Sequence, residues 1–192
     1  MSIIHRTTVK PTKLELLSGW LPKQPWYQGS GTPELTKAGG FRLEDPAGEV
    51  GMEFMAVTDT SGARPVTYHV PVSYRGAPLP DAPGDALIGT LEHGVLGERW
   101  VYDGAQDPLL LGQLTALLKG EVPAHAQSID GALEPGVYAR LDGDAAAPPE
   151  IVRVLESGGA AAGAVGEVSA EWQREDGQAV RGVFVTVRAS GS

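Results

Sequence analysis

The sequence predicts an α+β fold in which an antiparallel β-sheet packs with two helices. Helix signals occur in only two segments, 12–21 and 107–119, whereas apolar or alternating runs of strand length recur from residue 41 to residue 189. Short turns separate most consecutive strands, and a parallel βαβ sheet would need more helices between them. The length of 192 residues is that of one ordinary domain.

The first helix is predicted by a capping box. Thr12 is the N-cap and Glu15 stands at the N3 position, where its side chain reaches back to the N-cap backbone. Leucines follow at helical spacing, and Pro22 ends the helix near Leu21. Trp20 on this helix is expected in the core.

The second helix is predicted to begin at Asp107-Pro108, which is an N-cap aspartate followed by a proline in the first turn. Leucines form its apolar stripe, and Gly120 is the expected C-terminal stop after Lys119. This helix should therefore cover one face of the sheet.

Strands are predicted at 41–43, 50–59, 64–74, 86–92, 96–102, 136–141, 150–156, 165–174 and 179–189. Pro71 inside the third of these favours an edge position or a bulge, since proline has no N–H to donate. Asp176-Gly177 is a typical hairpin turn between the last two strands. Trp172 alternates with apolar neighbours and is expected to be packed.

The composition excludes several classes of protein. There is no cysteine, so disulfides, zinc–thiolate sites and thiol nucleophiles are excluded. The net charge of -9 argues against a general nucleic-acid-binding role. No apolar run is long enough to span a membrane, and the N-terminus lacks a secretory pattern, so a cytoplasmic protein is expected.

Charge is unevenly distributed along the chain. Residues 1–42 carry six Lys and Arg against two Glu, whereas the remaining residues are strongly acidic. Two interpretations are open: a basic N-terminal layer that lies on an acidic body, or a basic docking face for an acidic partner or a phosphorylated ligand.

No motif for metal, phosphate or nucleophilic chemistry is present. The sequence has no G-x-S-x-G, H-E-x-x-H, Walker or dinucleotide-binding fingerprint. The four histidines are scattered without the spacing of a metal site, so no metal and no cofactor is expected. Acidic residues are too common here for any carboxylate pair to indicate acid–base catalysis.

The loop after the first helix supplies the first binding candidates: Lys23, Gln24, Trp26 and Tyr27. The two adjacent aromatic residues either staple the helix to the sheet or form a stacking face for a sugar or a partner protein. Lys23 and Gln24 would belong to the same face.

A second set of binding candidates consists of Glu92 and His93, at a predicted strand end, and of Trp100. His93 either caps backbone groups of a turn or takes part in binding or catalysis. Glu92 and Trp100 would join the candidate face if the fold brings them near Trp26 and Tyr27.

Residues 16–29 (LLSGWLPKQPWYQG) resemble the start of bacterial maltokinases, where a helix runs into W-L-P-x-Q-R-W-F, a small residue, Gly and Lys. The chain departs from this pattern at Pro25, Tyr27 and Ser30. The segments 35–55, 66–79 and 86–104 resemble stand-alone actinobacterial proteins built on the same cap domain, some of which carry the label 1,4-α-glucan branching protein. The matching residues of the short motif are Trp20, Leu21, Pro22, Gln24, Trp26 and Gly29.

The resemblance implies a cap made of a curved antiparallel sheet and a helix, with cystatin-like topology. It implies a cap-like region at 1–120 and a C-terminal β extension at 121–192, packed together as one globular unit. In maltokinases phosphate transfer belongs to a kinase region, whose catalytic aspartate and magnesium ligands have no counterpart here. A branching enzyme needs a large α/β barrel that 192 residues cannot hold. No catalytic residue is therefore predicted, and an enzyme is not the expected class.

The leading hypothesis is a non-catalytic cap-like binding or regulatory module in maltose, trehalose and α-glucan metabolism. Its expected partner is a maltokinase, a trehalose synthase or another α-glucan enzyme. Two alternatives stay open: a protein that binds malto-oligosaccharide or glycogen through the same aromatic residues, and a small enzyme with a site around His93. A symmetric homodimer through an open sheet edge is also open.

Overall fold

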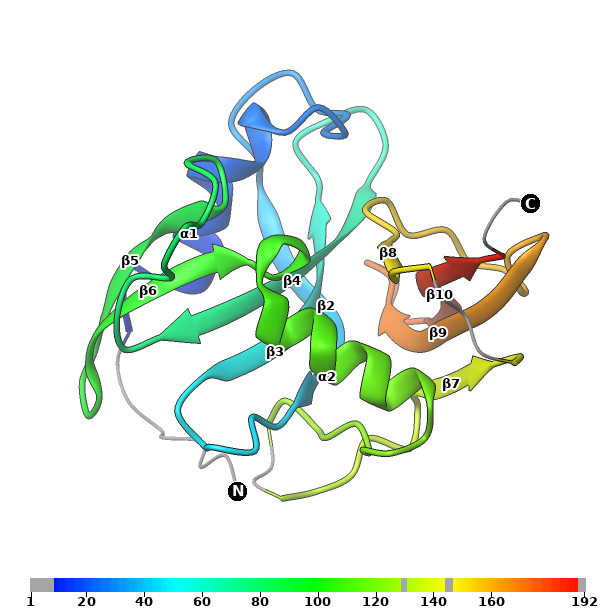
Figure 1. Cartoon of the computed structure of the whole chain (residues 1–192). Coiled ribbons are helices and arrows are strands. Elements are labelled where there is room, and N and C mark those ends of the chain that lie inside the picture. Colours follow the sequence, from blue (N-terminus) through cyan, green and yellow to red (C-terminus); the bar gives the residue numbers. More distant parts are fainter. Residues whose placement is uncertain (1–8, 129–130, 144–146, 190–192) are drawn as a thin grey trace.

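The computed structural model describes residues 9–128, 131–143 and 147–189 (Figure 1). These residues form a mostly antiparallel sheet with two α-helices, which confirms the predicted α+β class. None of the helices in these ranges is long and apolar enough to cross a membrane.

Within the sheet, hydrogen-bonded strands lie side by side in the order β1-β5-β6-β4-β3-β2-β9-β10-β8, and β7 pairs with β9. Every pairing is antiparallel. Two helices and two short 3₁₀ turns complete the described fold: α1 (Lys13–Trp20), α2 (Pro108–Leu118), Leu21–Lys23 and Gly104–Gln106. The strands are β1 (Val9–Lys10), β2 (Leu35–Leu43), β3 (Gly51–Asp59), β4 (Val66–Arg75), β5 (Leu87–His93), β6 (Gly97–Asp103), β7 (Tyr138–Leu141), β8 (Glu150–Ile151), β9 (Ala164–Gln173) and β10 (Ala179–Arg188).

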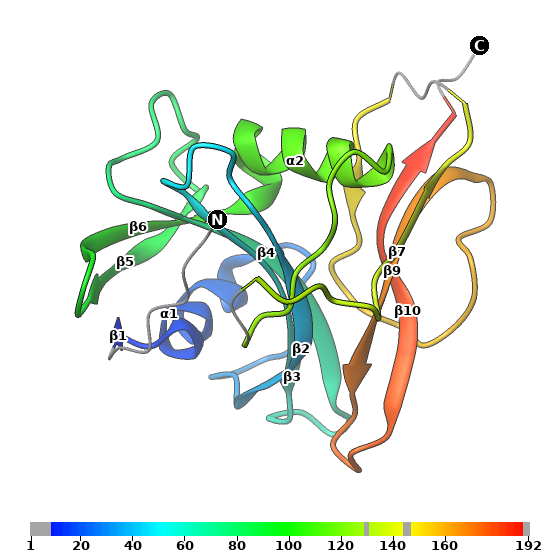
Figure 2. The same cartoon turned by 90° about the horizontal axis from the view of Figure 1, so that it is seen from below.

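The two helices lie on opposite faces of the sheet formed by β2, β3 and β4 (Figure 2). The capping box of α1 is formed as predicted: the Glu15 backbone donates to Thr12 Oγ1 and the Thr12 backbone donates to Glu15 Oε2. The predicted N-cap of α2 is also present, since the Leu109 backbone donates to Asp107 Oδ1. Local sequence signals therefore set where both helices begin.

The extended segment 152–155 covers part of the outer edge of β4. The His69 backbone donates to the Arg153 carbonyl at 2.9 Å, and the Leu155 backbone donates to that of Thr67 at 2.8 Å. β6 covers the remainder of this edge at residues 72–75. Pro71, expected at an edge or a bulge, thus lies in an interior strand. Pro71 lies between the part of this edge covered by segment 152–155 and the part covered by β6. Neither neighbour therefore needs a hydrogen bond from the N–H that proline lacks.

Hydrogen bonds continue from segment 152–155 around a closed ring. The Val152 backbone donates to the carbonyl of Phe184 on β10, β10 pairs with β9, and β9 meets β2 where Trp172 faces Gly39. β2, β3 and β4 complete the circuit. Gly40 allows β2 to bend here: its φ is +127°, and a Cβ would lie 2.0 Å from a β3 carbonyl oxygen.

Aromatic side chains fill the interior of the ring. Phe41 and Phe54 stack with ring centroids 4.5 Å apart, and Phe184 of β10 lies 6.1 Å from Phe41. Trp172 is buried as expected and packs edge-on to Phe184. Residues before and after position 120 therefore contribute to one hydrophobic core.

Candidate functional site

Trp26 and Tyr27 pack against the sheet beside the end of α1. The Trp26 ring lies 5.8 Å from the rings of both Trp20 and Tyr68. Tyr27 Oη donates to Asp59 Oδ2 at 2.9 Å, and burial together with this hydrogen bond raises the pKa of Tyr27. Both side chains are half-buried. Their contacts are those of a staple between the loop and the sheet, which is one of the two expected roles.

Lys23 and Gln24 lie on the same loop, and Lys23 is exposed. Gln24 Nε2 donates to the Trp20 carbonyl at 3.3 Å, so its amide is partly used by the helix end. On the sheet side, the Arg153 guanidinium lies 4.9 Å from the Trp26 ring centre and donates to Asp103. The solvent-facing part of the loop is therefore formed by its polar residues and by the outer edges of the two aromatic rings.

The β5–β6 hairpin separates the other three candidates. His93 faces the α1 side of the sheet and lines a cavity there. Glu92 and Trp100 occupy alternate positions and so lie on the opposite face. His93 Nδ1 accepts hydrogen bonds from the backbones of Val95 and Leu96, so the ring caps the turn, as one of the two predicted roles requires. The structure thus distributes the candidates over three places.

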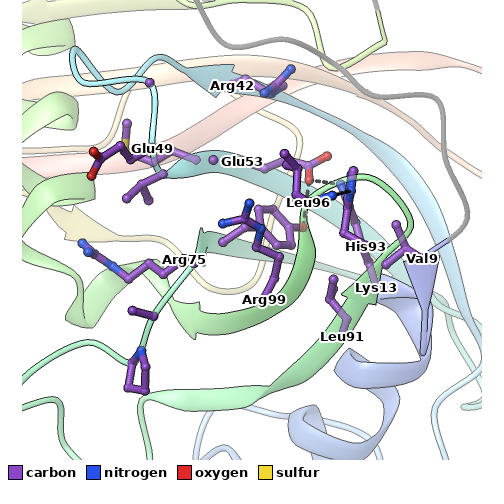
Figure 3. Close-up of a pocket in the computed structure, with 18 of the residues that line it drawn as sticks. Val9, Lys13, Arg42, Glu49, Glu53, Arg75, Leu91, His93, Leu96 and Arg99 are labelled. Carbon is purple, nitrogen blue, oxygen red and sulfur yellow. Dashed lines mark hydrogen bonds and ion pairs between the residues drawn. The ribbon is translucent and has the colours of Figure 1, made fainter.

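A cavity of about 960 Å³ opens on the α1 side of the sheet, which the sequence alone does not reveal (Figure 3). It lies between the start of α1, the ends of β3 and β4, the β5–β6 hairpin and the turn that precedes β3. Asp45 holds that turn in place by accepting hydrogen bonds from three of its backbone N–H groups. The charged residues that line the cavity are Lys13, Arg42, Glu49, Glu53, Arg75 and Arg99.

Glu53 is the buried centre of this cavity wall, with only 5% of its side chain exposed. Its carboxylate lies 2.5 Å from Lys13 Nζ and 3.9 Å from Lys37 Nζ, and it accepts hydrogen bonds from Tyr74 Oη and Gln127 Nε2. Burial acts to raise the pKa of Glu53, but the two lysines and the tyrosine outweigh it and the pKa is lowered. The group therefore stays ionised at neutral pH. Lys13 and Lys37 belong to the basic N-terminal segment, so this part of the segment lies on an acidic residue of the sheet.

Two arginines of the cavity differ in their partners. Arg75 makes a two-pronged ion pair with the buried Asp107, at 2.7 and 2.8 Å, which also caps α2. Arg99 makes no ion pair with any residue in the described ranges, and its buried Nε has no hydrogen-bond partner there. Its guanidinium lies close over Gly76, where a Cβ would be 2.6 Å from Nη1.

The described part of the chain contains no group of three or more His, Asp or Glu side chains that could hold a metal ion. The charged cavity residues come from α1, β2, β3, β4, β6 and the turn before β3. No local spacing in the sequence relates them, so only the fold brings them together.

Fold and site together define an α+β protein with a helix on each face of its sheet and an arginine-lined cavity on one of them. Residues 20–107 match the family model of the maltokinase N-terminal cap domain, which confirms the resemblance found in the sequence. The match begins at the last residue of α1, ends at the N-cap of α2 and covers slightly less than half of the chain. Comparison with curated proteins gives no match.

Proposed function

We propose that the protein is a non-catalytic cap-like binding or regulatory module associated with maltose, trehalose and α-glucan metabolism. The observation that carries this proposal is the family match over residues 20–107, which is to the cap of maltokinases. In the maltokinases that the sequence resembles, phosphate transfer belongs to the kinase region and not to the cap. The cap-like region 1–120 and the extension 121–192 act as one unit in this proposal, and their common core supports it.

The buried acidic groups support binding over catalysis. Glu53 is held ionised by two lysines and two hydrogen-bond donors. The Asp107 carboxylate accepts hydrogen bonds from Arg75, from Ser73 and from the backbone at the start of α2. Carboxylates whose oxygens are already engaged by structural partners are poorly placed to exchange a proton with a substrate. A small enzyme around His93 is the weaker hypothesis, because the turn backbone already uses His93 Nδ1.

The proposed docking face is the loop after α1, with Lys23 and Gln24 and the outer edges of Trp26 and Tyr27. Its partner is a maltokinase, a trehalose synthase or another α-glucan enzyme. An aromatic surface with a polar rim is typical of protein interfaces, and the family match gives the metabolic context.

Binding to purified enzymes of the source organism tests this proposal. The protein is immobilised, and the maltokinase, the trehalose synthase and a glycogen-branching enzyme are passed over it in turn. We expect saturable binding to one of them and a clear loss of affinity for Lys23→Glu. Lys119→Glu is the matched control, because Lys119 is an exposed lysine just after α2, on the other face of the sheet. Equal loss in both variants, or no binding to any enzyme, would contradict the proposal.

Direct binding of a malto-oligosaccharide is a second candidate, favoured by the partial exposure of Trp26 and Tyr27. Titration with maltoheptaose should then shift the tryptophan fluorescence and saturate. A flat response up to millimolar sugar would count against this candidate and leave the protein-partner proposal unaffected.

A further inference from the structure

We propose that the cavity beside Arg99 is a binding site for a small molecule that carries a phosphate group. This site lies on the α1 side of the sheet near the β5–β6 hairpin, apart from the Trp26–Tyr27 loop. The inference therefore goes beyond the proposed function and does not depend on it.

The cavity is locally cationic in an acidic protein. Four Lys and Arg side chains line it against two glutamates, although the chain as a whole carries a net charge of -9. Lys13 is paired with Glu53 and Arg75 with Asp107. Glu49 is exposed at the rim, and its carboxylate points away from Arg99 in Figure 3. The cationic excess is therefore concentrated at Arg99, which makes no ion pair with any of the described residues.

Arg99 has the features of a ligand-binding arginine. Its guanidinium lies among the residues that line the cavity, close over Gly76 (Figure 3). Its Nε is buried without a hydrogen-bond acceptor among the described residues, although buried donors are normally satisfied. The planar guanidinium presents several N–H donors in a fixed fork, which matches the oxygens of a phosphate group. A phosphate in the cavity would give this guanidinium the anionic partner that the described residues do not provide.

The size and walls of the cavity favour a small molecule over a polymer. A volume of about 960 Å³ is at the upper end of the range for small-ligand sites and exceeds what a free phosphate fills. Tyr74, Leu91 and Leu96 add apolar wall for the body of the ligand. An extended polyanion would instead meet the acidic surface that the net charge implies.

Isothermal titration calorimetry with three probes tests the inference on the full chain: inorganic phosphate, glucose 1-phosphate and glucose. We expect saturable binding of at least one phosphate-bearing probe and none of glucose. Arg99→Gln should weaken that binding by about tenfold or more, the loss expected for a charge-assisted hydrogen bond. Arg64→Gln is the matched control, because it removes the same charge at an exposed position. Arg64 lies in the turn between β3 and β4, at the ends of these strands opposite to the cavity.

The arms of the experiment separate the sources of the phosphate. Tighter binding of glucose 1-phosphate identifies a phosphate ester, and equal binding of inorganic phosphate identifies the free ion. On the unaltered protein, the Arg99 Nε–H signal in NMR should shift on titration. The inference is overturned if neither phosphate probe binds, or if Arg99→Gln binds as tightly as Arg64→Gln while the Arg99 signal stays fixed.

Discussion

The ring of His69 on β4 lies 4.6 Å from that of Phe184 on β10, and its Nδ1 donates to the Phe184 carbonyl oxygen at 3.1 Å. Nδ1 is equally close to the carbonyl of Val152. Because both partners can only accept, the proton of the neutral ring resides on Nδ1. This single buried histidine connects the region that matches the maltokinase cap with the strands beyond it.

His69 should make the protein less stable in acid. Burial, helped by the nearby charge of Arg153, lowers its pKa to about 3, against 6.5 for an exposed histidine. The contribution of the neutral ring is therefore complete above pH 6.5 and decreases as the pH falls toward 3. The slope from this group approaches about 1.4 kcal/mol per pH unit.

Urea unfolding between pH 7.5 and pH 4 measures this effect in the unaltered protein and in His69→Phe. The variant is expected to be less stable at neutral pH, since two carbonyls lose their donor. Its stability should depend less on pH, because about one proton fewer is taken up on unfolding. The same pH dependence in both proteins would show that His69 does not titrate on unfolding.

Glu53→Gln should be destabilising by about 1–2 kcal/mol, because the hydrogen bonds from Tyr74 Oη and Gln127 Nε2 lose their charged acceptor, whereas Lys13 and Lys37 are 40% and 47% exposed and stay solvated. Glu49→Gln, an exposed change on the same cavity rim, should stay within about 0.5 kcal/mol of the unaltered protein. The free energy of unfolding from urea titration compares the two. Similar small effects would mean that the Glu53 network contributes little.

Tyr27→Phe should cost about 1 kcal/mol, since it removes the hydrogen bond to Asp59 and keeps the ring packed on Tyr68. Trp26→Ala should cost more, because the contacts with Trp20, Tyr68 and Arg153 are lost together. Thermal unfolding of both variants checks the order. Two near-neutral substitutions would indicate that the aromatic pair serves a ligand or partner and not the fold.

A fragment comprising residues 1–120 should not reach the native fold. Without the later strands, the edge of β4 at Thr67 and His69 loses its partner, and the rings of Phe41 and His69 lose their contact with Phe184. We expect poor dispersion of its amide NMR signals and no cooperative thermal transition. A well-dispersed spectrum from a monomeric fragment would show that the cap-like region folds independently.

Local signals in the sequence predicted most elements of the fold. The capping box at Thr12, the Asp107 N-cap and the turn at Gly177, with φ +79°, all stand where predicted. β2 starts at Leu35, earlier than the expected residue 41, because its first half is polar and contains Gly39 and Gly40, so no alternation marks it. β8 is shorter than predicted, since segment 152–155 leaves β10 for the edge of β4.

The candidate sites were less predictable than the fold. Trp26 and Tyr27 were expected to form either a staple or a stacking face. Their contacts in the structure are with Tyr68 and Asp59, which lie far along the chain and which no local pattern connects to them. The cavity depends on Lys13, Glu53 and Arg99 meeting from three different elements. Such a charge arrangement is set by strand order and register, and neither can be derived from residue spacing alone.

The role proposed for this protein is that of a non-catalytic binding or regulatory module for an α-glucan enzyme. Steady-state kinetics of the source organism's maltokinase, with maltose and ATP and increasing amounts of the protein, test it most directly. We expect no turnover by the protein alone and a saturable change in kcat/KM of the enzyme, which Lys23→Glu should weaken. The trehalose synthase and the branching enzyme are assayed likewise with their own substrates. Turnover by the protein alone would contradict the non-catalytic role, and unchanged kinetics of all three enzymes at saturating concentrations would contradict the regulatory one.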